Sequence, residues 1–191
     1  MDRRTGQLKA VLKPAIGSVM TLAFSPDGRT LAGAGSNRTN IGDFIESGRV
    51  TLWDIPTGRI LRTLEGPTGR ANNVAFSPDG QTIAAGGLGP WRERWNNRVR
   101  LFTSEPVGEV RLWEVATGIP VWTAEGVSPV ASLAFSADGK SLAYRDLANV
   151  YLSDARNGKL NQIVMGSIVR FRPHRSRNRA PGKSGGRDGA G

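Results

Sequence analysis

Hydrophobic and polar residues alternate in short runs along most of this chain. In the first run Met20, Leu22 and Phe24 alternate with smaller residues, which is the period-two pattern of a β-strand with one buried face. Ser-Pro-Asp-Gly follows at residues 25–28 and is typical of a type I turn, because proline presets φ at the second position. A second strand is predicted at residues 30–33. Since no segment has a sustained helical period, the pattern predicts an all-β protein.

This strand–turn–strand unit occurs three times. The sequence Ala-Phe-Ser-Pro-Asp-Gly at residues 23–28 returns at residues 75–80 and, with Ala in place of Pro, at residues 134–139. A second motif follows each copy: Val-x-Leu, then Trp-Asp, Trp-Glu or Ser-Asp, and three residues later Thr-Gly or Asn-Gly. Each copy predicts four short strands. The residues of the repeated motif are Phe24, Asp27, Gly28, Trp53 and Asp54, then Phe76, Asp79, Gly80, Trp113 and Glu114, and finally Phe135, Asp138, Gly139 and Asp154.

The combined motif resembles the WD-repeat (WD40-type) β-propeller family, in which each repeat forms a four-stranded blade. The resemblance implies blades at residues 19–64, 71–124 and 130–164. The sequence departs from the family pattern in several ways: the Gly-His pair before each first strand is missing, Ser153 stands where the third copy should have Trp, and the connections at residues 36–48 and 88–108 are longer than the usual tight turn. The buried His–Ser/Thr–Asp–Trp network that ties blades together in the family is therefore expected to be absent.

The two ends of the chain do not add a complete blade. Residues 1–12 align with the end of the first repeat and predict an orphan outer strand of a preceding or final blade, whereas residues 165–191 are rich in Arg, Gly, Ser and Pro and predict a disordered basic tail. Known propellers have about four to eight blades. The sequence therefore predicts an incomplete β-propeller of three four-stranded antiparallel blades, as a fragment or frameshifted product of a longer WD-repeat protein. Self-association through the open blade faces is expected.

Composition and charge exclude several classes of function. The 191 residues contain 0 Cys and 1 His, which leaves little for catalytic triads or zinc sites, so no catalytic residue, cofactor or metal is expected. Asp27, Asp79 and Asp138 could suggest a carboxylate set, but they fit turn residues that bond their own backbone, and equivalent positions on different blades are expected to lie far apart. No apolar run approaches the roughly 20 residues of a membrane span, and no signal peptide is evident at the N-terminus. The expected location is cytoplasmic, with no membrane partner.

One segment has an individual character, a long insertion at residues 88–108 that is predicted as a loop between the second and third strands of its repeat. Three interpretations remain open: a β-hairpin extension with residues 97–102 as an added strand and its aromatics on the blade edge, a protein contact, or a nucleic-acid contact. Candidate partner contacts are Trp91, Arg92, Arg94, Trp95, Arg98 and Phe102 of the insertion, and Phe44 of another loop.

The resemblance implies a non-catalytic protein–protein interaction scaffold whose partner is an unidentified protein. The alternatives are nucleic-acid binding through the Arg-rich tail and the Trp/Arg insertion, or no independent function. Of the net charge of +10, most lies in the tail, where seven basic residues follow position 169 against one acidic residue. Because the remaining chain is only mildly basic, nucleic acid is not the favoured partner.

Overall fold

The computed structural model describes residues 11–13, 17–37, 47–96, 101–126 and 128–165. Within these ranges the chain forms twelve β-strands and no helix, arranged as three four-stranded sheets. Neighbouring strands in every sheet are antiparallel and consecutive in sequence. This confirms the predicted all-β fold with three four-stranded antiparallel sheets, each of which we call a blade.

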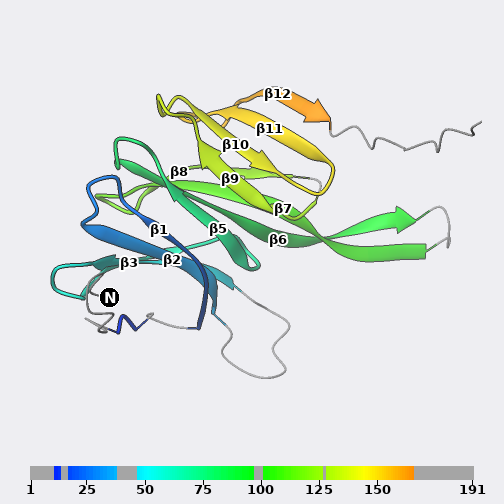
Figure 1. Ribbon diagram of the computed structural model, residues 1–191. Helices are drawn as coiled ribbons and strands as arrows, with labels where there is room; N and C mark the ends of the chain where they lie inside the picture. Colours follow the sequence, from blue (N-terminus) through cyan, green and yellow to red (C-terminus); the bar gives the residue numbers. More distant parts are fainter. Residues whose placement is uncertain (1–10, 14–16, 38–46, 97–100, 127, 166–191) are drawn as a thin grey trace, which may run out of the picture.

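Figure 1 shows the three blades as successive layers. Blade 1 consists of β1 (Ser18–Phe24), β2 (Thr30–Asn37), β3 (Ser47–Asp54) and β4 (Ile60–Glu65). Blade 2 consists of β5 (Ala71–Phe76), β6 (Thr82–Asn96), β7 (Leu101–Glu114) and β8 (Pro120–Glu125). Blade 3 consists of β9 (Ser132–Phe135), β10 (Ser141–Arg145), β11 (Asn149–Asp154) and β12 (Leu160–Met165).

The turn between the first two strands of each blade is stabilised by its own Ser and Asp side chains. In blade 1 the amide of Gly28 donates to the carbonyl of Ser25 at 2.9 Å, which closes the turn. The Oδ1 atom of Asp27 accepts bonds from the Ser25 hydroxyl at 2.6 Å and from the Arg29 amide at 3.0 Å. Gly28 has a φ of 68°, a left-handed conformation that favours glycine. The corresponding turns of blades 2 and 3 have the same bonds.

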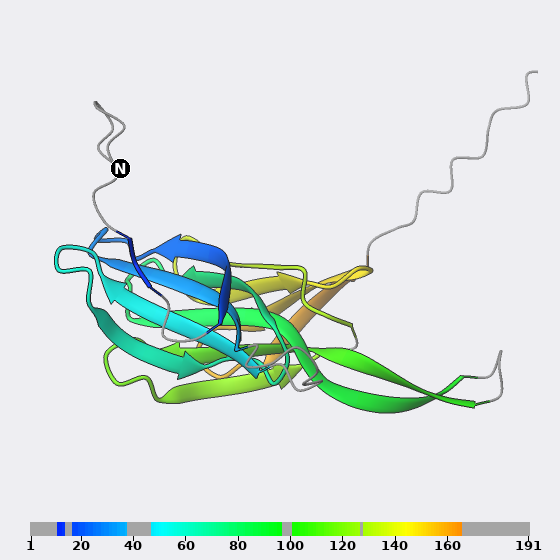
Figure 2. The same cartoon turned by 90° about the horizontal axis from the view of Figure 1, so that it is seen from below.

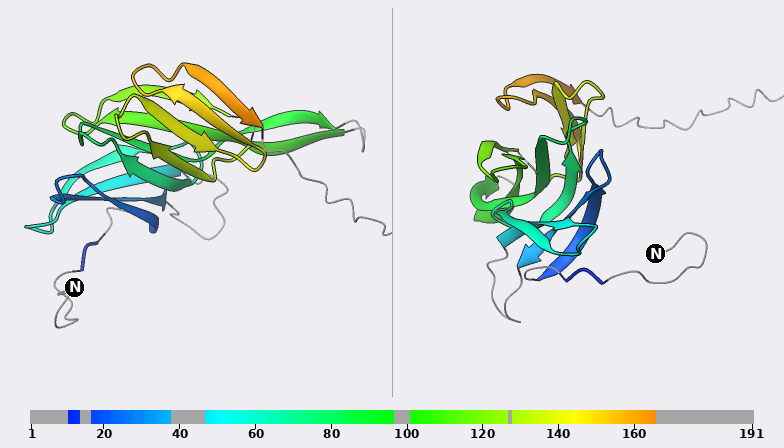
Figure 3. Two further views of the ribbon diagram at one scale, coloured as in Figure 1. Left: turned by 45° about the horizontal axis from the view of Figure 1, so that its top comes forward. Right: turned by 90° about the vertical axis from the view of Figure 1, so that its left-hand side faces the viewer.

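Strands β1, β5 and β9 lie on the inner side of the fan of blades, where β1 contacts β5 and β5 contacts β9 (Figure 3). Two apolar cores fill the spaces between blades. The core between blades 1 and 2 contains Ala32, Ala34, Val50, Leu52, Leu64, Ala71, Val74, Ile83, Ala85 and Trp113. The core between blades 2 and 3 contains Ala84, Val110, Leu112, Val130, Leu142, Tyr144 and Tyr151. Burial of these side chains is the main force that holds the blades together.

Polar contacts at the outer strands add to these cores. Arg62 of β4 donates through Nη2 to the carbonyl of Ala116 in the next blade at 2.8 Å. At the equivalent place one blade later, the indole N–H of Trp122 in β8 donates to the carbonyl of Ala155 at 2.9 Å. The outer strands β4 and β8 are thus each tied to the turn that follows the third strand of the next blade.

The insertion differs from the predicted loop at residues 88–108. Strands β6 and β7 continue through it as a paired hairpin. Of the three interpretations of this insertion, the backbone pairing favours a β-hairpin extension. The added strand was predicted at residues 97–102, and β7 begins at Leu101, whereas residues 97–100 lie outside the described residues. The extension contains the aromatic residues Trp91, Trp95 and Phe102, which favour strands, and each strand supplies backbone partners for the other.

Two terminal predictions fall largely outside the described residues. Of the orphan strand at residues 1–12, Val11 and Leu12 are described, and neither belongs to a strand. A Cβ atom placed on Gly58 would lie 3.6 Å from Cδ2 of Leu12, while one placed on Gly118 would lie 3.1 Å from Cδ2 of Leu64. Leu12 therefore contacts blade 1 at the position where Leu64 contacts blade 2. Residues 166–191, which include nearly all of the predicted tail, are not described.

Candidate interaction surfaces

The hairpin extension of blade 2 projects beyond the rest of its sheet (Figure 2). Its register runs from Trp91 opposite Pro106 to Asn96 opposite Leu101. An irregularity between Leu88 and Trp91 separates this extension from the part of β6 that pairs within the blade. In the described register β5 and β8 end before the extension, so its two strands pair only with each other. Each strand of the extension thus presents an open backbone edge.

The two side chains at the start of the extension differ, because Trp91 is exposed and Arg92 forms an ion pair. The Trp91 side chain is 63% exposed, so it does not cover the edge of the blade as the hairpin interpretation had proposed. Arg92 donates through Nη2 to both carboxylate oxygens of Glu125 at 2.8 and 2.9 Å. This ion pair is half-exposed on both sides, and it links the extension to the end of β8.

A buried carboxylate lies at the base of the extension. Glu109 in β7 is almost fully buried. One of its oxygens accepts bonds from the amide of Thr68 at 3.0 Å and from the Thr68 hydroxyl at 2.8 Å, while the other pairs with Nε of Arg111. These contacts join the segment before β5 to the strand that carries the extension. Nothing in the sequence marks Glu109, because a single Glu in a strand has no distinctive spacing.

The remaining predicted contact residues are only partly covered by the description. Arg94, Trp95 and Phe102 take part in the backbone pairing of the extension, with Trp95 opposite Phe102 and Arg94 opposite Thr103, but their side chains are not described. Arg98 and Phe44 lie outside the described residues. The structure therefore brings Trp91, Arg92, Arg94, Trp95 and Phe102 to one hairpin.

The three turn aspartates are occupied by their own turns. The Ser25 hydroxyl, and after it the Arg29 amide, hold the pKa of Asp27 below its ordinary value. The same two kinds of donor lower the pKa of Asp79 and of Asp138. Each carboxylate thus stays ionised and bonded inside its turn. Among the described residues, no group of three or more acidic or histidine side chains could hold a metal ion.

These turns do not lie far apart, contrary to the expectation from the sequence. A Cβ atom on Gly80 would lie 3.4 Å from Pro26, and one on Gly139 would lie 3.5 Å from Pro78. The turns of successive blades are therefore neighbours along one end of the fan. The expectation was wrong because blades pack face to face, which places equivalent turns side by side.

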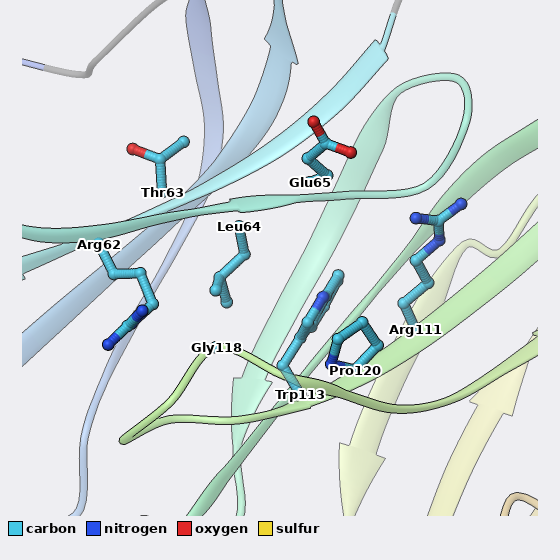
Figure 4. A pocket seen from close by; sticks show the side chains of 8 residues that line it. All are labelled: Arg62, Thr63, Leu64, Glu65, Arg111, Trp113, Gly118 and Pro120. Atoms are coloured by element: carbon cyan, nitrogen blue, oxygen red, sulfur yellow. The ribbon is translucent and has the colours of Figure 1, made fainter.

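A cleft of about 260 Å³ opens between the outer parts of blades 1 and 2 (Figure 4). Leu64 of β4 and Trp113 of β7 approach each other from its two walls, and both belong to the core between these blades. Glu65 and Arg111 line the same cleft. The cleft is the outer end of the core between blades 1 and 2. It is lined by the apolar side chains of Leu64 and Trp113 and by charged side chains.

Blade 3 contains a polar network that the sequence analysis did not find. Asp146, which is almost fully buried, accepts bonds from the amides of Ala148 and Asn149, both at 2.7 Å, and from the Tyr151 hydroxyl at 2.9 Å. Burial raises the pKa of Asp146, but these hydrogen bonds together outweigh it and hold the pKa below its ordinary value. Burial, and then the bond to Asp146, raise the pKa of Tyr151.

A second part of this network occupies the position of the missing Trp. The Ser153 hydroxyl contacts the Tyr144 hydroxyl at 3.4 Å, and the rings of Tyr144 and Tyr151 stack with centroids 5.3 Å apart. The smaller Ser153 side chain leaves room for this aromatic pair. Blade 3 thus has its own buried polar network, although the His–Ser/Thr–Asp–Trp set of the family is missing from its sequence.

Four-stranded antiparallel blades that pack face to face, with their first strands innermost, define an open β-propeller. A family model described as "WD domain, G-beta repeat" matches residues 6–54 and 58–103. The chain therefore belongs to the WD-repeat β-propeller family, as a partial propeller of about three blades. The two matched repeats are offset from the blades. The second one begins at residue 58 and so includes β4, the outer strand of blade 1, before the first strands of blade 2.

Similar proteins support this assignment. The chain is 25% identical over 141 residues to WD repeat-containing protein SL1-17 of Schistosoma mansoni, covering 59% of this chain and 46% of that protein. The solved structure of U3-55K matches with a TM-score of 0.61 and 17% identity, covering 82% of this chain and 42% of that one. Chaetomium thermophilum Sqt1, solved bound to the N-terminus of ribosomal protein L10, matches with a TM-score of 0.54 and 18% identity over 76% of this chain and 33% of that one. This chain spans less than half the length of each of these proteins.

Proposed function

We propose that this chain is a non-catalytic scaffold that binds a protein partner, and that the hairpin extension of blade 2 is its main contact surface. WD-repeat propellers are typical of interaction scaffolds, and one similar structure, that of Sqt1, was solved with a protein segment bound. The observation that carries the proposal is the exposure of Trp91 on a hairpin whose strands pair only with each other. Exposed Trp is a frequent hot spot of protein interfaces.

The rigid attachment of the hairpin supports the same proposal. The ion pair between Arg92 and Glu125 and the buried contacts of Glu109 fix the base of the extension to the blade. A contact surface that is held in place before binding loses less conformational freedom when the partner docks. The open backbone edges offer a partner strand a row of hydrogen-bonding groups.

The test compares two exposed apolar side chains of similar accessibility. Trp91→Ala removes the proposed anchor, whereas Ile119→Ala, at a side chain 61% exposed in the turn after β7, is the matched control. Proteins retained by the wild-type chain in a pull-down are quantified by mass spectrometry for each variant. We expect Trp91→Ala to reduce retention of the partner about tenfold or more and Ile119→Ala to leave it unchanged.

Two other results would contradict the proposal. Equal retention by Trp91→Ala and the wild type would remove the hairpin from the contact surface. Recovery of nucleic acid in place of protein, with retention that falls steeply as salt is raised, would favour the nucleic-acid alternative. The structure adds no support to that alternative: Arg92 is neutralised by Glu125, and the arginines of the tail lie outside the described residues.

Two expectations from the sequence remain predictions. The first is that the chain is a fragment or a frameshifted product of a longer WD-repeat protein. The nucleotide sequence tests it, since an alternative frame near residues 167–173 should continue the repeat. The second is a cytoplasmic location, which imaging of the tagged chain would test. Among the described residues, no helix is long and apolar enough to cross a membrane.

A further inference from the structure

Each blade has two unlike faces, and both internal cores use them in the same way. We call the face that carries Ala23, Ala75 or Ala134, the residue before the last of each first strand, the small-residue face, and the opposite one the large-residue face. In each core the small-residue face of one blade packs on the large-residue face of the next. The first core joins Ala32 and Val50 to Ile83 and Trp113, and the second joins Ala84 and Val110 to Leu142 and Tyr144.

Blade 1 has a large-residue face that no blade covers. Leu22 is 59% exposed, whereas Val74, its equivalent in blade 2, is 9% exposed. Phe24 is 67% exposed, whereas Phe76 and Phe135 at the same repeat position are partly buried. These side chains lie on β1, on the inner side of the fan (Figure 3).

Blade 3 has the opposite deficit, an uncovered small-residue face. Val150 is 37% exposed, whereas its equivalents Val50 and Val110 are 0% and 1% exposed. Val164 is 46% exposed, whereas Leu64 at the same position of blade 1 is 3% exposed. The described residues thus contain two complete interfaces between blades. They also leave uncovered one large-residue face, on blade 1, and one small-residue face, on blade 3.

We infer that two copies of this chain pair head to tail, with the large-residue face of blade 1 in each copy packed on the small-residue face of blade 3 in the other. The two faces differ, so neither can reproduce the internal packing with a copy of itself. Two copies of three blades supply six blades, which is within the range of about four to eight for closed propellers, whereas three copies would exceed it. A closed pair covers both open faces of each copy.

The segment before β1 competes with this contact. The indole N–H of Trp53 donates to the carbonyl of Lys13 at 3.0 Å, and Leu12 lies beside Gly58. This is the outer part of the large-residue face, where β12 of the second copy would pack. Trp53 is 2% exposed, so the outer part of this face is already covered in the single chain, and pairing requires Leu12 and Lys13 to move aside with loss of the hydrogen bond to Trp53.

Arg145 also opposes the contact. It lies on the small-residue face of blade 3, where blades 1 and 2 have Ala34 and Gly86. Its Nη1 lies 3.4 Å from the carbonyl of Asp146, so the side chain can lie back over the turn. Arg145→Ala should therefore strengthen pairing, because it restores the small side chain of the other blades.

The first test is the mass of the full-length chain in solution, measured by light scattering across a concentration series. We expect a concentration-dependent species of twice the 20.5 kDa of one chain. Phe24→Asp and Val150→Asp should each raise the dissociation constant by roughly 100-fold or more, because a closed pair of variant chains loses two buried apolar side chains and each corresponds to about 10- to 100-fold. Leu147→Asp, at a turn residue 85% exposed, is the matched control and should change nothing.

Mixing the two disruptive variants distinguishes head-to-tail pairing from pairing of like faces. A mixed pair of Phe24→Asp and Val150→Asp contains one unmodified interface, so it should form at concentrations where each variant alone is monomeric. If one of the two variants pairs as well as the wild type, the proposal is wrong.

Cross-linking provides a test that does not depend on the disruptive variants. A Cβ atom on Gly86 would lie 3.0 Å from Leu133, and their repeat equivalents are Arg145 and Leu22. Since the chain has no Cys, Leu22→Cys with Arg145→Cys in one chain should give a dimer band with a short bismaleimide, and neither single variant should. No band from the double variant would contradict the proposal.

Two mass results would also overturn it. A mass that rises without limit would show open polymers in place of a closed pair. A monomer at every concentration would show that second copies do not cover these faces, and would leave further blades of a longer chain as the occupant.

Discussion

Blades 2 and 3 are built from the same repeat, but their surroundings differ. Blade 2 packs between two neighbours, so Val110 and Leu112 on its small-residue face are buried. Blade 3 packs on one neighbour, and of the equivalent residues Val150 is 37% exposed and Leu152 is only partly buried. The repeat therefore determines the blade, whereas the neighbouring blade determines how much free energy each apolar position contributes.

The two blades also differ in their internal chemistry. Blade 2 places Trp113 in the core toward blade 1, whereas blade 3 has Ser153 and uses the stacked Tyr144 and Tyr151 to fill the equivalent space. The buried Asp146 then satisfies the Tyr151 hydroxyl. Loss of the repeat's Trp is thus accompanied by a polar network, which requires hydrogen bonds to remain stable in a buried place.

The largest expected effect comes from one matched pair of core truncations. Leu112→Ala should lower the free energy of unfolding by about 2–5 kcal/mol, because it leaves a cavity in a closed core. Leu152→Ala should cost about half as much or less, because its side chain already meets solvent. Urea unfolding at a low protein concentration, where the chain is monomeric, measures both. Equal losses would show that the face of blade 3 is covered in the single chain.

An intermediate effect is expected at the network that distinguishes blade 3. Asp146→Asn should cost about 1–3 kcal/mol, because it weakens a buried acceptor of three hydrogen bonds. The pKa of Asp146 is lower in the folded chain, so its stabilisation is present above the unfolded pKa of about 3.9 and is lost as pH falls through the folded value.

Unfolding curves between pH 2 and pH 7 measure this dependence. The wild type should lose more stability than Asp146→Asn as the pH falls below about 4. Tyr151→Phe is the companion variant, which removes one donor and keeps the ring stack. Parallel pH curves for the wild type and Asp146→Asn would contradict the role of the carboxylate.

The smallest effect is expected at the extension of blade 2. Arg92→Ala removes an ion pair that is half-exposed on both sides, so it should change the free energy of unfolding by less than about 0.5 kcal/mol. Glu125→Gln removes the charge of the other member of the ion pair and should change the free energy of unfolding by a similarly small amount. A larger loss from either would show that the pair supports the blade itself as well as the position of the hairpin.

Much of the fold could be predicted because its signals are local. Ser-Pro-Asp-Gly specifies its own turn through the bonds of Ser25 and Asp27, and alternation along β1 marks a strand. Glu109 and Asp146 could not be predicted, because their bonding partners are set by the loop before β5 and by the turn at residues 146–149. The hairpin was one of several possibilities, since strand pairing in an insertion depends on both strands together.

Residues within a few positions of each other specify the repeat, the four strands of each blade and the turns that join them, so these features follow from the amino-acid sequence alone. The packing of one blade on the next sets which face of each blade is buried, places equivalent turns side by side, and leaves Leu22 and Val150 uncovered. The physical reason is that burial depends on the next blade, and neither the strand pattern nor the turn motif records whether that blade is present.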